Sequence, residues 1–168
     1  MYTDILYPTD GSPGANAALE HVRDLAERHD ATVHVLTVVN SRYIEYQPGM
    51  MSGESKDKQA GMMGDSPNNV KSGMIRDVPE NMRSAVKERA EGVLEEAAAH
   101  LEGVKSTREI RVGDPHDVIL SYTNSNEIDI VVMGTHGRSG LDRYLIGSVA
   151  EKVVRLSDVP VVTVRSSQ

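Results

Sequence analysis

Short apolar runs alternate with amphipathic segments along this chain, and this alternation constrains the fold more than any other feature. The runs are rich in β-branched residues and predict strands at residues 5–7, 32–39, 105–112, 128–133 and 160–164. Apolar residues recur at steps of three and four, which predicts helices, over residues 15–26, 80–101, 115–122 and 148–156. Strands separated by helices pair in parallel through right-handed crossovers. The predicted fold is therefore α/β, an open five-stranded parallel sheet of the Rossmann-like kind with helices on both faces.

Residues 40–79 interrupt this rhythm with Gly, Ser, Pro, Asn, Lys and Met and show no sustained period. The length of 168 residues favours one domain over residues 1–168, so we expect a long flexible insertion within it. Six methionines lie in or near it, namely Met50, Met51, Met62, Met63, Met74 and Met82. Because Met packs adaptably, we interpret the segment as a mobile lid or a partner-docking loop, with Cu(I) binding as the alternative.

Charge and composition exclude several classes of function. There are 25 acidic and 18 basic residues, giving a net charge of −7, and the only aromatic residues are six Tyr. A nucleic-acid binder normally has a basic face or clustered aromatics, so we expect no such partner. The absence of Cys excludes disulfides and thiolate sites. No apolar run approaches the ~20 residues that span a bilayer, and the first residues lack a basic signal region, so we expect a soluble, cytoplasmic protein without membrane contact.

Two loops that follow strands have an unusual composition, residues 8–12 and 134–148. Ligands of open parallel sheets bind outside the carboxyl ends of the strands. In the second loop Gly134, Gly137 and Gly140 allow close approach of the backbone, and Gly147-Ser148 stands where a helix begins, which favours phosphate binding. The alternative for Ser148 is a capping box with Glu151, which needs no ligand.

At these positions the chain resembles the universal stress proteins (UspA family). The spacing Gly134-x2-Gly137-x9-Gly147-Ser148 matches the nucleotide motif of that family. The segments at residues 8–12, 113–115, 131–140 and 159–164 are also similar, and the resemblance covers residues 1–39 and 80–165. It implies a fold like that of the adenine nucleotide α-hydrolases, with ATP bound at the strand ends, together with Mg²⁺.

The resemblance also implies roles for individual residues. Asp10, with Pro8 and Thr9 beside it, matches the contact to the adenosine part, Val38 matches a backbone contact to adenine, and Met133 lies under the nucleotide. The ribose and phosphate contacts match Gly134, His136, Gly137, Gly147, Ser148 and Val149. The chain keeps the nucleotide motif intact, which places it with the family members that bind ATP.

The residues themselves leave alternatives open at this site. An ionised Asp10 accepts hydrogen bonds from ribose hydroxyls or the adenine amino group, but Asp-Gly also favours turns without a ligand. His136 could bind a phosphate or be a half-exposed loop residue. Arg138 and Arg143 could neutralise phosphate charge or pair with an acid such as Asp142. The other histidines lack metal-ligand spacing and are interpreted mostly as surface residues: His21, His29, His34, His100 and His116.

The last predicted strand, at residues 160–164, is short, β-branched and expected at a sheet edge, which invites pairing with a second chain through Val161 to Val164. The resemblance implies a homodimer through this strand, and the flanking Asp158, Pro160 and Arg165 could instead protect the edge. We expect a nucleotide-dependent stress-response module rather than an enzyme, because no general base stands out. The alternatives are a slow Mg-dependent ATPase or a self-phosphorylating protein, with Ser139 or Ser148 as acceptor, and a scaffold without nucleotide.

Overall fold

The computed structural model describes residues 1–40, 80–137 and 146–166, without the side chains of residues 80–83. Over these residues the chain forms one five-stranded sheet in the order β3-β2-β1-β4-β5, and all pairs are parallel. The strands are β1 (Asp4–Pro8), β2 (Thr32–Asn40), β3 (Ser106–Gly113), β4 (Ile130–Gly134) and β5 (Val161–Val164). The predicted open parallel sheet is confirmed, and β5 lies at an edge as expected.

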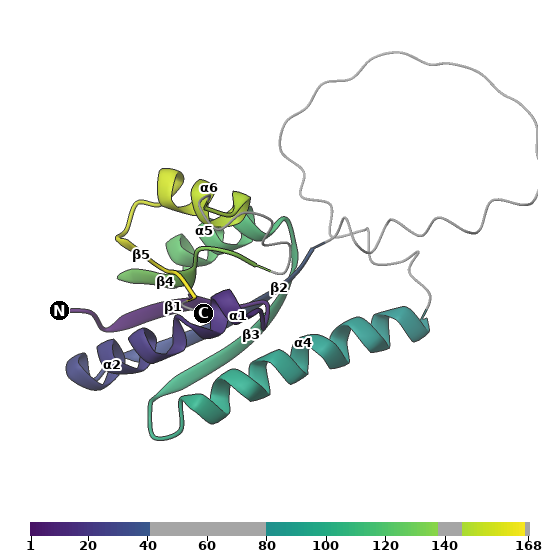
Figure 1. Cartoon of the computed structure of the whole chain (residues 1–168), viewed down its shortest axis with the longest axis horizontal. Coiled ribbons are helices and arrows are strands. Elements are labelled where there is room, and N and C mark those ends of the chain that lie inside the picture. The colour runs from purple at the N-terminus through teal and green to yellow at the C-terminus, as the bar shows by residue number, and fades with distance from the viewer. Residues whose placement is uncertain (41–79, 138–145, 167–168) are drawn as a thin grey trace, which may run out of the picture.

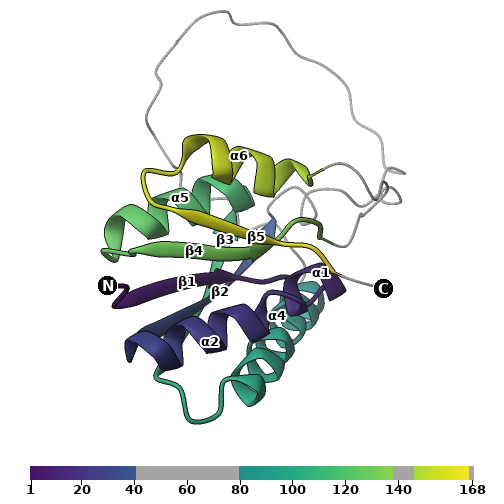
Figure 2. The same ribbon diagram turned by 60° about the vertical axis from the view of Figure 1, so that its left-hand side comes forward.

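Helices cover both faces of the sheet, as the alternating pattern predicts. They are α1 (Pro13–Asn16), α2 (Leu19–His29), α4 (Glu80–His100), α5 (Pro115–Ser125) and α6 (Ser148–Leu156). Figure 1 shows the long helix α4 running beside β3, and Figure 2 shows α2 and α4 on one face of the sheet with α5 and α6 on the other. The two faces therefore form two separate apolar cores.

The apolar residues of the central strands alternate between these two cores. Ile5 and Tyr7 of β1 pack with α2 and α4, whereas Leu6 packs with α5 and α6. In β4, Ile130 and Val132 belong to the first core, and Val131 and Met133 belong to the second. This explains the nearly continuous apolar runs, because a strand that is covered on both faces buries every side chain.

The helix predicted over residues 15–26 is divided in the structure. After α1 the N–H of Ala18 donates to the carbonyl oxygen of Ala15 at 2.9 Å, which closes a tighter turn than an α-helix has. The chain then enters α2, where the N–H of Val22 donates to Ala18. The apolar period continues through this turn, so the sequence gives no sign of the division.

The strand order fixes where a ligand could bind. From β1 the chain passes to β2 and β3 on one side, whereas β4 and β5 lie on the other side of β1. The switch in strand order therefore falls between β1 and β4, and the loops that leave these two strands are neighbours. An insertion is expected at residues 40–79; Asn40 ends β2, and residues 41–79 lie outside the described residues. Within the described part of the chain, no helix is long and apolar enough to cross a membrane.

Candidate functional site

The loop that leaves β1 is organised by its own polar side chains. The Oδ1 atom of Asp10 accepts a hydrogen bond from the N–H of Ser12 at 3.0 Å, and Oγ1 of Thr9 accepts one from the N–H of Gly11 at 3.1 Å. Gly11 has φ +72°, a conformation that glycine adopts without strain. The turn chemistry considered for Asp10 is therefore present, and it leaves the second carboxylate oxygen, Oδ2, on the side of the other loop.

The loop that leaves β4 is tied to both of its neighbours. The N–H of Thr135 donates to the carbonyl oxygen of Val164 at the end of β5, at 2.8 Å. The N–H of Gly147 donates to the carbonyl oxygen of Thr135 at 2.7 Å, which brings the start of α6 beside the end of β4. Oγ1 of Thr135 lies 2.9 Å from Nδ1 of His136. When the hydroxyl donates to Nδ1, the imidazole carries its proton on Nε2 and can donate it elsewhere.

The two loops meet at the switch in strand order. The hydroxyl of Ser12 donates to the carbonyl oxygen of His136 across 3.4 Å. A Cβ atom on Gly137 would lie 2.9 Å from Oδ2 of Asp10, so this glycine backbone is packed against the carboxylate. The structure thus brings Asp10, His136 and Gly137 together from segments more than a hundred residues apart in sequence.

Helix α6 begins beside these loops with an N-terminus that no side chain caps among the described residues. The N-cap residue is Gly147, with φ −63° and ψ 152°, and Ser148 is the first helical residue. The capping box considered for Ser148 and Glu151 is therefore wrong, because that motif needs Ser at the N-cap position. The first N–H groups and the positive end of the helix dipole favour an anion at this place.

Burial divides the described site residues into three sets. Pro8, Thr9, Met133 and Gly134 are buried, Asp10, Val38, His136, Gly147 and Val149 are half-buried, and Gly137 and Ser148 are exposed. Val38 lies two residues before the end of β2 and packs, like Met133, in the core below α5 and α6. A ligand at the carboxyl ends of the strands would reach the half-buried and exposed residues directly. Arg138 and Arg143, with Ser139, Gly140 and Asp142, lie outside the described residues.

The described glycines of the motif have a packing reason that sequence analysis did not consider. A Cβ atom on Gly134 would lie 2.3 Å from the carbonyl oxygen of Gly14, and one on Gly147 would lie 3.0 Å from that of Thr135. Their lack of a side chain is thus needed for contacts within the protein. Their predicted contacts with a nucleotide remain predictions.

Below the first loop lies Tyr7, whose side chain is fully buried. Its hydroxyl donates to the carbonyl oxygen of Ala15 at 3.0 Å and so holds α1 to β1. Burial raises the pKa of Tyr7 to about 12, because the phenolate would lose its hydration. Tyr7 therefore acts as a neutral donor below the site.

Two histidines interpreted as surface residues are mostly buried. The side chain of His34 is 13% exposed, with Nε2 at 3.0 Å from Oδ1 of Asp4 and Nδ1 at 3.0 Å from the hydroxyl of Tyr122. His116 is 14% exposed and lies between the carboxylates of Asp114 and Asp117. The surface interpretation is therefore wrong for these two histidines. Both are mostly buried for the same reason, because hydrogen-bonding and acidic partners offset the cost of burying the polar ring.

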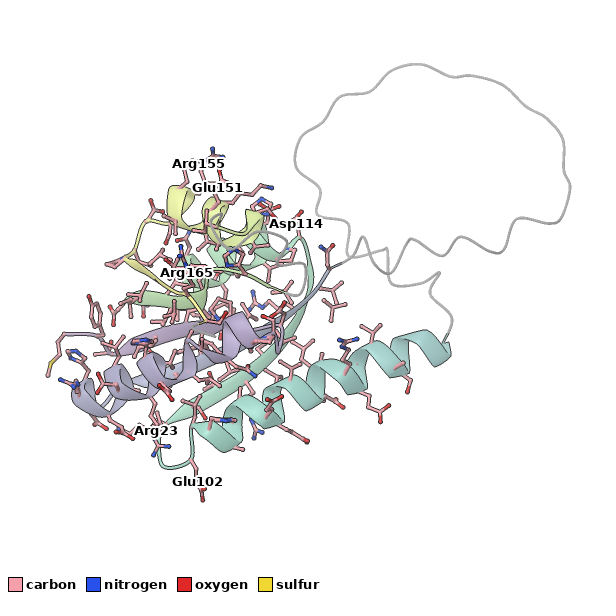
Figure 3. The ribbon with its side chains drawn as sticks, viewed as in Figure 1. Arg23, Glu102, Asp114, Glu151, Arg155 and Arg165 are labelled. Carbon is pink, nitrogen blue, oxygen red and sulfur yellow. The ribbon has the colours of Figure 1, made fainter. Side chains whose placement is uncertain are left out.

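Asp114, His116 and Asp117 are also the one group of described residues whose ligand atoms, all within 4.8 Å of one another, could hold a metal ion. Figure 3 shows Asp114 at the end of β3 opposite to the end near Glu102. The spacing Asp-x-His-Asp could have indicated this group in the sequence. The three residues already pair with one another at the start of α5, where the helix dipole favours acidic groups, so the cluster is explained without an ion.

Two hollows lie elsewhere on the described surface. One, of about 300 Å³, is lined by Glu91, Leu94, Glu95 and Arg108 between α4 and β3. The other, of about 260 Å³, lies near the end of α2 and the start of β3. Neither is lined by a residue of the two loops, and neither gathers donors for a phosphate, so the loops carry the stronger case for a site.

Comparison with known proteins shows the family of this chain. The family model described as the universal stress protein family matches residues 1–165. The chain belongs to the universal stress protein family. It is 32% identical over 167 residues to universal stress protein MJ0577 of Methanocaldococcus jannaschii, which covers 98% of this chain and 96% of the relative. The solved structure of MJ0577 superposes with a TM-score of 0.76 at 29% identity, covering 100% of this chain and 99% of that one.

Two more distant universal stress protein structures were solved with nucleotides. One is a complex with cAMP, 22% identical with a TM-score of 0.64, covering 99% of each chain. The other, from Arabidopsis thaliana, has AMP bound and is 20% identical with a TM-score of 0.61, covering 98% of this chain and 92% of that one. At these identities the likeness shows the shared fold.

Proposed function

We propose that this universal stress protein binds an adenine nucleotide, ATP above all, at the carboxyl ends of β1 and β4. The bound nucleotide would make it a regulatory module of a stress response. The observation that carries the proposal is the convergence of Asp10, His136 and Gly137 beside the start of α6, where no side chain of the described residues caps the helix. An acceptor for sugar hydroxyls and a set of anion-binding N–H groups stand next to each other there, as a nucleotide requires.

The nucleotide complexes of the cAMP-bound and AMP-bound family members support the same class of ligand. In the proposed arrangement Asp10 and Val38 hold the adenosine part. The backbone at residues 136–137 and at the start of α6 holds the phosphates. The triphosphate is favoured over the smaller ligands because the intact glycine motif extends from the end of β4 to Ser148.

Mg²⁺ is part of the proposal because it accompanies most protein-bound triphosphates and prefers oxygen ligands. The carboxylate of Asp10 can supply an oxygen ligand, because its Oδ2 atom faces Gly137 in the loop that leaves β4. It would otherwise repel the phosphates, so an ion between them is compatible with its charge. When bound, the ion would neutralise phosphate charge.

We also propose that the protein is a homodimer that pairs through β5. This strand is at the sheet edge, and Val162 on it is 37% exposed. On the neighbouring helix Val154 and Leu156 are 48% and 51% exposed. An apolar edge of this kind is normally covered by a partner or blunted by charge.

The proposed function is tested by titrating the purified protein with MgATP in a calorimeter, after denaturing a sample and analysing released nucleotides by mass spectrometry. The variant Asp10→Ala removes the proposed acceptor and should weaken binding by about tenfold, the effect of losing one charge-assisted hydrogen bond. The matched control is Asp24→Ala, which removes a carboxylate from the solvent face of α2, where it pairs with Arg28. The control should bind as the wild type does.

A flat titration of a protein that also carries no nucleotide would refute the proposal and favour the scaffold. Equal affinities of Asp10→Ala and the wild type would refute the assignment of the site. Release of phosphate from MgATP, or a mass increase by one phosphoryl group, would identify the slow ATPase or self-phosphorylating protein instead of the binding module.

A further inference from the structure

The short helix α1 and the loop that leaves β4 touch through their backbones. A Cβ atom on Gly14 would lie 2.2 Å from the carbonyl oxygen of His136 and 3.2 Å from its carbonyl carbon. From the other side, a Cβ atom on Gly134 would lie 2.3 Å from the carbonyl oxygen of Gly14. Neither position has room for any side chain, because the obstructing atoms are backbone and cannot rotate away.

The hydroxyl of Ser12 reinforces this contact. Ser12 is 2% exposed, and its Oγ accepts a hydrogen bond from the N–H of Ala15 at 3.2 Å, which makes it the N-cap of α1. The same hydroxyl donates to the carbonyl oxygen of His136. One side chain therefore both starts α1 and fixes the peptide group that joins His136 to Gly137.

Helix α1 is itself held from the opposite side. Tyr7 donates to the carbonyl oxygen of Ala15, and Nδ2 of Asn16 donates to Oε1 of Glu96 in α4 at 3.2 Å. A Cβ atom on Gly11, just before α1, would lie 2.8 Å from Val93 of α4. Because α1 is anchored to β1 and α4, we expect a side chain added at Gly14 to displace the backbone at His136 and Gly137 rather than α1.

We infer that Gly14 and Ser12 are positioning residues, which set the place of the His136–Gly137 backbone and thereby the affinity for the phosphate part of the nucleotide. The inference rests on the proposed function for its ligand. Preorganised donors bind better because the cost of ordering them is met in the folded protein. Gly14 also packs against Gly134, and the N–H of Ser12 also donates to Asp10. The contacts of Gly14 and Ser12 with the carbonyl oxygen of His136 are those that reach the backbone at residues 136–137.

The test compares Gly14→Ala with Gly92→Ala. Both replace a helical glycine by alanine, but a Cβ atom on Gly92 meets nothing within 4 Å. In ¹H–¹⁵N NMR spectra without nucleotide, the amide signals of His136 and Gly137 should shift in Gly14→Ala and stay in place in Gly92→Ala. The affinity of Gly14→Ala for ATP should fall about tenfold or more, as for one lost charge-assisted hydrogen bond.

The affinity for adenosine, measured by NMR titration, separates positioning from general destabilisation. A partly unfolded protein would lose affinity for ATP and adenosine by the same factor, whereas a displaced phosphate loop lowers the affinity for ATP more. Equal losses for the two ligands, or unmoved signals of His136 and Gly137, would overturn the inference. If the wild type binds no ATP, the proposed function fails by itself, and the NMR spectra still decide whether α1 positions the loop.

A second pair of variants serves if Gly14→Ala does not fold. Ser12→Ala removes the hydroxyl that contacts His136, and Ser12→Thr keeps it and remains a good N-cap. We expect Ser12→Ala to shift the His136 signal and to bind ATP several-fold more weakly than Ser12→Thr does. Equal affinities of these two variants would contradict the inference.

Discussion

At the scale of single residues, Tyr7 shows how one buried polar group supports a functional edge. Its hydroxyl holds α1 through Ala15, and it lies in the same core as Ile5 and Val132. The carbonyl oxygen of Ala15 also accepts from Ala18, so removing the hydroxyl leaves no buried acceptor without a donor. The replacement Tyr7→Phe should therefore cost about 1 kcal/mol at neutral pH, the net worth of a typical hydrogen bond.

The pH dependence of Tyr7→Phe has a definite sign. The pKa of Tyr7 is raised from 10.0 to about 12, so its contribution to stability is fully present below pH 10 and is lost as the pH rises toward 12. The wild type should lose unfolding free energy in this window through Tyr7, on the order of 1 kcal/mol per pH unit, and Tyr7→Phe should not. Urea unfolding at pH 8, 10 and 11 measures the difference. Parallel pH profiles of the two proteins would show that Tyr7 does not titrate as described.

At the scale of the elements, helix α4 carries a glycine that nothing in its surroundings requires. Gly92 lies within the helix, and a Cβ atom there would point into open space. Gly92→Ala should raise the free energy of unfolding by about 0.5–1 kcal/mol, because alanine loses less conformational freedom in a helix. Thermal and urea unfolding would measure it. A loss of stability would mean that α4 packs more tightly at this position than the structure indicates.

At Gly14 and Gly134, unlike at Gly92, a side chain has no room. Each fills a place where two backbones touch. The predicted role of Gly134, close approach to a ligand, rested on the glycine spacing of the loop. The contact with α1 could not be predicted, because the two partners are far apart in the sequence and meet only when the sheet is assembled.

At the scale of the whole molecule, the two edges of the sheet allow a test of the proposed dimer. Val162 lies on β5, and Val112, 43% exposed, lies on β3 at the other edge. Val162→Lys should convert a dimer to a monomer in light-scattering chromatography, because a charge on an apolar edge opposes pairing. The matched variant Val112→Lys should remain dimeric. A monomeric wild type, or a dimeric Val162→Lys, would contradict pairing through β5.

The order of the elements, the parallel sheet and the helices on its two faces follow from the sequence alone. Burial on both faces makes a strand continuously apolar, and burial on one face gives a helix its period, so these signals are local and readable. The turn at Asp10 and the glycine spacing from Gly134 to Ser148 could also be read from the sequence, because each involves residues close together in the chain. The insertion expected at residues 40–79 rests on the lack of any period there and stays a prediction.

Tertiary structure alone decided the strand order, which makes β1 and β4 neighbours and so joins Asp10 to Gly137. It also decided the burial of His34 and His116, the Gly147 N-cap of α6 and the contact between Gly14 and His136. The strand order, the histidine burial and the Gly14 contact depend on groups distant in the sequence. The N-cap of α6 depends on which of two adjacent residues begins the helix. Periodicity reports which side of an element is buried, and only packing determines what it is buried against.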